Sequence, residues 1–127
     1  MAVQTFSFKH ERLFAPLLLI YGVTPLRSWV RVDDTHLRVR YGFFYVETPL
    51  ENIADVKVTG PYSPLKSLGP RGSLVDGGAT YGTTGAGGVC ICFHERVKAL
   101  KPASNPALTV TVTDPEGLAE TLRSRIT

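Results

Sequence analysis

Apolar and polar side chains alternate with a period of two over most of this chain, and this pattern limits the fold to one built mainly from β-strands. Residues 27–32 and residues 36–41 show the alternation most clearly, with apolar residues on one face and arginines on the other. Between them stands Asp33-Asp34-Thr35, a sequence that favours a turn. We therefore expect a β-hairpin with one apolar and one polar face.

The same alternation predicts further strands, at residues 3–9, 43–48, 55–60, 89–94 and 108–113. With the hairpin they make about seven. The inward-facing residues of two of them are expected to be Phe6, Phe8, Val56 and Val58. A leucine-rich run at residues 13–21 predicts a buried helix, although a strand also fits so short an apolar run.

The C-terminal segment has the features of an amphipathic helix. Asp114 suits the N-cap, Pro115 suits the first helical position, and Glu116 complements the positive end of the helix. An apolar stripe follows, made of Leu118, Leu122 and Ile126. We expect this helix to cover an open end or face of the sheet.

A chain of 127 residues is close to the usual size of one domain. We expect a single domain over residues 1–127, with an N-terminal strand and helix extension over residues 1–26 and a core over residues 27–127. The longest apolar run, residues 13–23, is too short to span a bilayer and lacks the pattern of a secretory signal. A cytoplasmic location is expected, with a peripheral position at the membrane left open.

Catalysis and metal binding are not expected. The formal net charge is +3 with acidic and basic residues mixed, and no nucleic-acid recognition motif is present. Cys90 and Cys92 are interpreted as small buried hydrophobic residues without metal-ligand spacing. Cys92 and His94 could form a thiol–imidazole pair on one strand face, but no nucleophile motif surrounds them. We predict no catalytic residue, no metal and no cofactor.

Two groups of basic residues are candidate ligand-binding sites. On the polar face of the hairpin, Arg38 and Arg40 are expected to lie near Arg27 and Arg31 and to bind an anion or a partner. The alternative is a solvated face whose charge is offset by nearby carboxylates. The aromatic residues around positions 41–45 are interpreted as core, with edge-strand association into an oligomer as the alternative.

The second group lies in a glycine- and proline-rich stretch over residues 60–88. This stretch predicts a long irregular connection, with an edge strand near residues 78–82. Its backbone N–H groups, together with Lys66 and Arg71, could hold an anion, although the stretch matches no phosphate-binding motif. The alternative is a flexible structural loop in which Arg71 pairs with Asp76.

Five stretches of the chain carry a resemblance to a known family: VRVDDTHLRVRYG (residues 30–42), TPLENI (48–53), TGPY (59–62), GVCICF (88–93) and LTVTVTDPE (108–116). In this order they resemble the small pleckstrin-homology-like (PH-like) domains of bacteria, particularly of actinobacteria. The resemblance implies a PH-like antiparallel β-barrel or sandwich capped by a C-terminal α-helix. In eukaryotic relatives, basic residues around the first hairpin loop bind phosphoinositides. The acidic Asp33-Asp34-Thr35 loop of this chain departs from that pattern.

These observations predict a non-catalytic PH-like binding or scaffolding module. It would act through its sheet face or residues 60–88 on a protein or an anionic membrane surface. The alternative is a carrier of a small molecule or lipid, with a pocket beneath residues 60–88.

Overall fold

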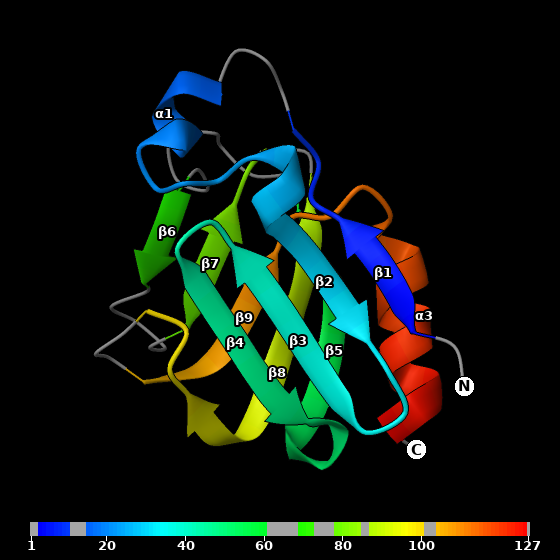
Figure 1. The fold of residues 1–127 in the computed structure, drawn as a ribbon. Helices are drawn as coiled ribbons and strands as arrows, with labels where there is room; N and C mark the ends of the chain where they lie inside the picture. The colour runs from blue at the N-terminus through cyan, green and yellow to red at the C-terminus, as the bar shows by residue number, and fades with distance from the viewer. Residues whose placement is uncertain are drawn as a thin grey trace.

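The computed structural model describes residues 3–10, 15–60, 69–72, 78–84, 87–100 and 104–126. Within these ranges the fold is mainly β, with one sheet of four strands, a second of five, and a C-terminal helix packed on the second sheet. Figure 1 shows the two sheets as stacked layers, with the helix beside them at one edge. No helix in the described part of the chain is long and apolar enough to cross a membrane.

The first sheet is an antiparallel meander in the order β1-β2-β3-β4. Its strands are β1 (Gln4–Ser7), β2 (Ser28–Val32), β3 (His36–Tyr41) and β4 (Phe44–Pro49). The predicted hairpin is confirmed, since β2 and β3 pair around the turn at residues 33–35. Because β1 precedes β2, that turn is the second connection of the sheet. The first connection contains α1 (Ala15–Leu19) and the 3-10 helix η2 (Pro25–Arg27).

The second sheet has the order β5-β8-β9-β7-β6 and is antiparallel except for the pair β7–β9. It follows the 3-10 helix η3 (Leu50–Asn52) and consists of β5 (Ile53–Thr59), β6 (Gly69–Gly72), β7 (Ala79–Gly82), β8 (Gly88–Val97) and β9 (Asn105–Val110). The described residues thus form nine strands, where the sequence pattern predicts about seven. The strand predicted at residues 78–82 is confirmed as β7, but it is not an edge strand, because it lies between β9 and β6.

The C-terminal helix α3 (Pro115–Ile126) begins as predicted. The Asp114 Oδ1 atom accepts a hydrogen bond from the Gly117 backbone N–H at 3.0 Å, which caps the helix. The buried residues Leu118 and Leu122 face the core, while α3 packs on β5 and β8. Two side chains link α3 to both sheets: Arg123 donates to the Val56 carbonyl, and Arg125 donates to the Val32 carbonyl.

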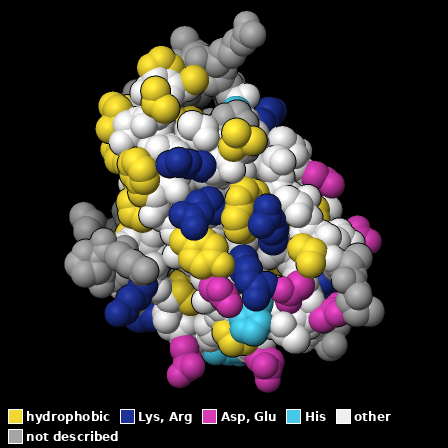
Figure 2. Space-filling view, in the orientation of Figure 1, with side chains coloured by type: hydrophobic (Ala, Val, Ile, Leu, Met, Phe, Trp, Pro, Cys, Tyr) yellow, Lys and Arg dark blue, Asp and Glu magenta, His cyan; other side chains and the backbone are white. Residues whose placement is uncertain are grey.

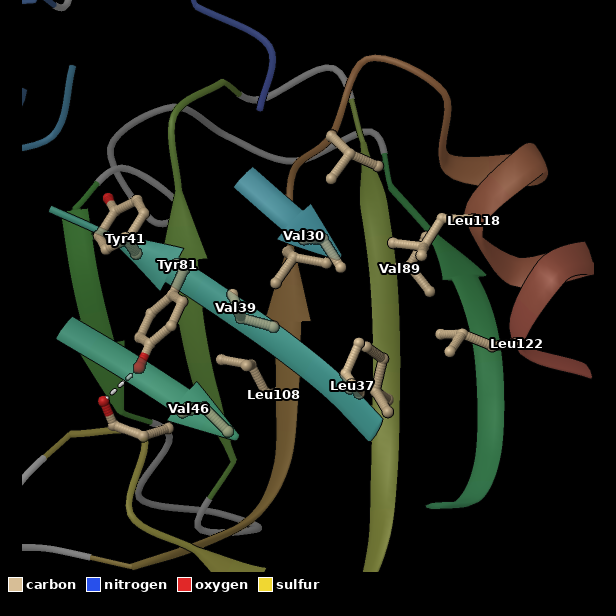
Figure 3. Close-up of a cluster of buried hydrophobic side chains, with 14 of the residues drawn as sticks. Val30, Leu37, Val39, Tyr41, Val46, Tyr81, Val89, Leu108, Leu118 and Leu122 are labelled. Carbon is tan, nitrogen blue, oxygen red and sulfur yellow. Dashed lines mark hydrogen bonds between the residues drawn. The ribbon is translucent and has the colours of Figure 1, made fainter. Parts of the chain in front are cut away.

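Buried side chains of both sheets and of α3 form the core, and Figure 3 labels residues from all three, including Leu118 and Leu122 of α3. The rings of Tyr41 from β3 and Tyr81 from β7 stack with centroids 4.7 Å apart and planes 6° from parallel. The Tyr41 hydroxyl donates to the Gly82 carbonyl and the Tyr81 hydroxyl to the Ala99 carbonyl, each at 2.5 Å. Burial raises the pKa of both phenols, so they stay neutral donors in the folded protein.

The segment predicted as an N-terminal extension takes part in the sheet and the core. β1 pairs with β2, and Phe8 is buried and bridges to Val112, which follows β9. Residues 13 and 14 of the predicted buried helix lie outside the described residues. In the part that is described, α1 covers residues 15–19, and the prediction of burial is wrong there because only Leu18 is buried. Consecutive leucines on a helix point in different directions, so one contact face cannot cover them all.

Val58 also differs from its prediction. Val56 is buried, whereas Val58 is 43 % exposed. β5 is the edge strand of the second sheet, and Val58 lines an open groove between this strand and the charged side of α3. Alternation therefore identified the face correctly, but the edge position left this residue uncovered.

Candidate functional site

The outer face of the first sheet carries six side chains in two rows across the strands. Trp29, Arg40 and Tyr45 are paired positions on β2, β3 and β4, and Arg31, Arg38 and Glu47 form the next row. Their neighbours along each strand are buried in the core, so these six must point away from it. We call this surface, made of Trp29, Arg31, Arg38, Arg40, Tyr45 and Glu47, the arginine face.

Aromatic rings support two of the three arginines. The Arg31 guanidinium carbon lies 3.9 Å from the centre of the Trp29 ring, and that of Arg40 lies 4.9 Å from the centre of the Tyr45 ring. The two rings meet edge to face at 6.4 Å. Stacking occupies the flat side of a guanidinium and leaves the N–H donors in its plane. Arg31 and Arg40 are therefore held in place with donors still available to a ligand.

Arg38 has a different environment from the other two arginines. It forms ion pairs with the Asp33 carboxylate and, at 3.5 Å, with Glu47. Asp33 also accepts hydrogen bonds from the backbone N–H groups of Thr35 and His36. These N–H bonds, with Arg38 adding to them, hold the pKa of the Asp33 carboxyl far below its ordinary value. Arg38 thus stabilises the turn, and its charge is largely compensated.

Arg31 and Arg40 have no such compensation. Within the described ranges, neither has a carboxylate at ion-pair distance. The charge compensation that the alternative expects is thus seen at Arg38, and among the described residues it is not seen at Arg31 or Arg40.

Exposed apolar side chains gather at one end of the arginine face, the end that carries α1 (Figure 2). We call this group the apolar tip. It consists of Leu17 (43 % exposed), Leu19 (63 %), Ile20 (70 %), Leu26 (89 %) and Phe43 (69 %). The tip is formed by the connection between β1 and β2 together with the turn between β3 and β4.

Backbone hydrogen bonds fix the two parts of the tip to each other. The Gly42 N–H donates to the Arg27 carbonyl at 2.7 Å, and the Phe43 N–H donates to the Tyr21 carbonyl at 3.1 Å. Gly42 has φ +60°, and a Cβ there would lie 2.2 Å from the Tyr21 carbonyl oxygen. Only glycine allows so close an approach, so the β3–β4 turn is locked against the α1 connection.

His10 and Ser28, which lie near the two ends of the β1–β2 connection, are hydrogen-bonded to each other. The Ser28 hydroxyl donates to the Thr24 carbonyl at 2.6 Å and lies 2.6 Å from His10 Nε2. Because the single hydroxyl proton is already used, Nε2 must be the donor to Ser28. Burial lowers the pKa of His10, which favours the neutral ring.

A shallow notch of about 180 Å³ lies where the apolar tip meets the arginine face. Its lining residues are Leu26, Arg27, Trp29, Arg40, Gly42 and Phe43. Two basic residues, Arg27 and Arg40, thus line one notch together with apolar and aromatic residues. A phosphate or carboxylate group is small enough to enter this notch, and its negative charge would be attracted by the two arginines.

Of the four candidate residues predicted from the sequence, the described part of the structure places two on one surface. Arg38 and Arg40 share the arginine face, as predicted, whereas Arg71 lies on β6 of the second sheet, opposite Thr80. The Arg71 side chain and all of Lys66 lie outside the described residues. So do residues 61–68 and 73–77, and the predicted pocket beneath this stretch stays a hypothesis.

The sequence interpretation missed the apolar tip and the ring supports. The aromatic residues around positions 41–45 are interpreted as core, but Tyr45 is half-buried on the outer face and Phe43 is exposed. A usable signal was present, because Trp29 alternates in phase with Arg31 and out of phase with Val30.

The cysteine pair shows no sign of activation. Cys90 and Cys92 are free, half-buried thiols on the outer face of β8, beside Lys57 and Asp55. Burial and the neighbouring Cys90 raise the pKa of the Cys92 thiol, which works against the reactive thiolate. In the ranges that the structure describes, no three His, Cys, Asp or Glu side chains group as metal ligands.

Comparison of the chain with protein-family models, curated proteins and solved structures found no match.

Proposed function

We propose that this protein is a non-catalytic binding module that recognises anionic surfaces through its arginine face. The observation that supports this most directly is the pair of uncompensated arginines, Arg31 and Arg40, stacked on Trp29 and Tyr45. Exposed arginines without carboxylate partners attract anionic groups, and ring stacking reduces the conformational entropy that each loses on binding. In this proposal the module acts in the cytoplasm.

A PH-like fold belongs to the same proposal. It is supported by the order of a four-stranded meander, a second sheet and a C-terminal helix packed on that sheet. The turn at residues 33–35 is acidic, and Asp33 already forms an ion pair with Arg38. That end of the sheet is therefore unfavourable for an anion. The uncompensated charge lies nearer the opposite end, beside the notch.

Charge reversal on the arginine face tests this function. The double variant Arg31→Glu with Arg40→Glu is compared with the wild type for binding to heparin, polyglutamate and anionic lipid vesicles. Calorimetry measures the two soluble polyanions and co-sedimentation measures the vesicles. Each basic residue near an anionic surface contributes about 1 kcal/mol, so the double reversal should weaken binding by more than about tenfold.

Arg96→Glu is the matched control. Arg96 is also exposed, but it lies on β8 in the second sheet. This variant should bind as the wild type does. The proposal is wrong if the wild type binds none of the three probes, or if Arg96→Glu weakens binding as much as the double variant.

A further inference from the structure

We infer that the protein docks on anionic lipid bilayers tip first, with the apolar tip inserted at the interface and a lipid phosphate held in the notch beside it. This inference rests on the proposed function and names its partner. It uses two features that anion recognition alone does not need, the exposed apolar side chains and their position relative to the arginines.

The apolar tip is unusual for a protein surface in water. Single exposed leucines are common, whereas five large exposed apolar side chains gather here at one end of the molecule, four from the β1–β2 connection and Phe43 from the β3–β4 turn. Leu26, Ile20 and Phe43 are each about seven-tenths exposed or more. The backbone hydrogen bonds of Gly42 and Phe43 hold the two parts of the tip against each other. Transfer of this patch out of water is the gain that membrane insertion would supply.

The notch stands at the base of the tip, where a headgroup phosphate would lie if the tip entered the bilayer. Arg27 and Arg40 line the notch, and so do Leu26 and Phe43, which belong to the apolar tip. A lipid molecule has both an acyl chain and a phosphate. In this arrangement the acyl chain would contact Leu26 and Phe43, and the phosphate would contact Arg27 and Arg40. A soluble anion would use the arginines but not the two apolar side chains.

Polarity changes in a regular order along the strands, away from the tip. The Trp29–Arg40–Tyr45 row comes first, then the row of Arg31 and Arg38 with Glu47, and then the acidic turn with Asp33 and Asp34. Figure 2 shows this order, from hydrophobic through basic to acidic side chains. Tryptophan, tyrosine and arginine prefer the membrane interface, while carboxylates avoid anionic lipid.

The spacing of the rows fits the depth of an interfacial anchor. Successive rows are two residues apart, which is about 7 Å along a strand. Apolar faces of interfacial segments enter the bilayer by about 5–10 Å. Insertion of the tip to this depth would leave Arg40 and Trp29 at headgroup level and keep the acidic turn in water.

The test removes two apolar side chains of the tip and leaves every arginine unchanged. The double variant Ile20→Ser with Leu26→Ser and the wild type are compared on vesicles of phosphatidylcholine with about 30 mol % phosphatidylglycerol, on neutral phosphatidylcholine vesicles, and on heparin. Loss of the two side chains should weaken binding to anionic vesicles by about tenfold or more and leave heparin binding unchanged. Val3→Ser, which removes a 56 % exposed apolar side chain next to the far end of β1, should change neither.

A second readout uses Trp29, the one tryptophan of the chain. Anionic vesicles should shift its emission to shorter wavelength, and lipids with brominated acyl chains should quench it. Inorganic phosphate at millimolar concentration should do neither and should not displace the vesicles.

The outcomes separate this inference from the proposed function. Wild-type binding to heparin or polyglutamate without vesicle binding, unchanged vesicle binding by the Ile20/Leu26 variant, or displacement by inorganic phosphate overturns tip-first docking and leaves anion recognition intact. Unchanged binding by the Arg31/Arg40 variant to every probe overturns the proposed function itself.

Discussion

At the scale of single residues, the arginines of one sheet face have different roles because their neighbours differ. Arg38 meets Asp33 and Glu47 and completes the turn between β2 and β3. Arg40, two residues further along the same strand, meets the Tyr45 ring. The alternation places both on the same face, but only the surrounding side chains separate a structural arginine from one available for binding.

Asp33→Asn should reduce stability at about pH 7 and have a smaller effect in acid. The asparagine can still accept the two backbone N–H bonds but loses the charge opposite Arg38. Since the folded-state pKa of Asp33 is lowered, its contribution is complete above the unfolded pKa of about 4 and is lost as the pH falls below that value toward the folded pKa. Urea unfolding followed at a series of pH values measures this. Asp34→Asn is the control, and a difference from wild type that stays constant down to about pH 2 would contradict the linkage.

At the scale of elements, α3 is defined by local signals at its start and by contacts with both sheets along its length. The Asp114 carboxylate caps the first turn, and Leu118 bonds through its N–H to the Asp114 carbonyl at 3.1 Å. Arg123 and Arg125 then reach a carbonyl in each sheet. By contrast, α1 has one buried residue, Leu18, and its exposed leucines form part of the apolar tip.

Asp114→Ala should destabilise the protein by about 1 kcal/mol, because the Gly117 N–H loses its acceptor at the helix start. Asp114→Asn keeps a side-chain oxygen at the cap and should cost only a fraction of that. Chemical denaturation of the two variants measures the difference in the free energy of unfolding. An equal loss in both would show that the charge of Asp114, and not the cap bond, is what matters.

At the scale of the whole molecule, the tyrosine pair joins the two layers. Tyr41 and Tyr81 come from different sheets, stack on each other and place both hydroxyls on backbone carbonyls. This buried contact lies between the arginine face on one layer and the second sheet. It holds β3, and with it Arg40 and the Gly42 turn, in a fixed position.

Tyr41→Phe should cost about 1–2 kcal/mol, since the buried Gly82 carbonyl loses a donor that water cannot replace. Tyr45→Phe removes a hydroxyl of the same kind from an exposed bond to Glu47, and it should cost well under about 0.5 kcal/mol. Thermal and urea unfolding of both variants provide the comparison. Equal stability of Tyr41→Phe and wild type would show that the hydroxyl does not link the layers.

The sequence by itself determined the β-strands of the first hairpin, the face on which Arg38 and Arg40 lie, and the start of α3. Each depends on local rules, namely the period of two in a strand, the preference of Asp33 for a turn, and the capping geometry of Asp114. The tertiary structure alone decided that β6 covers β7, that Val58 is exposed at an edge, and that Leu26 and Phe43 meet in one tip. Those outcomes depend on contacts between segments far apart in the chain, which local periodicity does not encode.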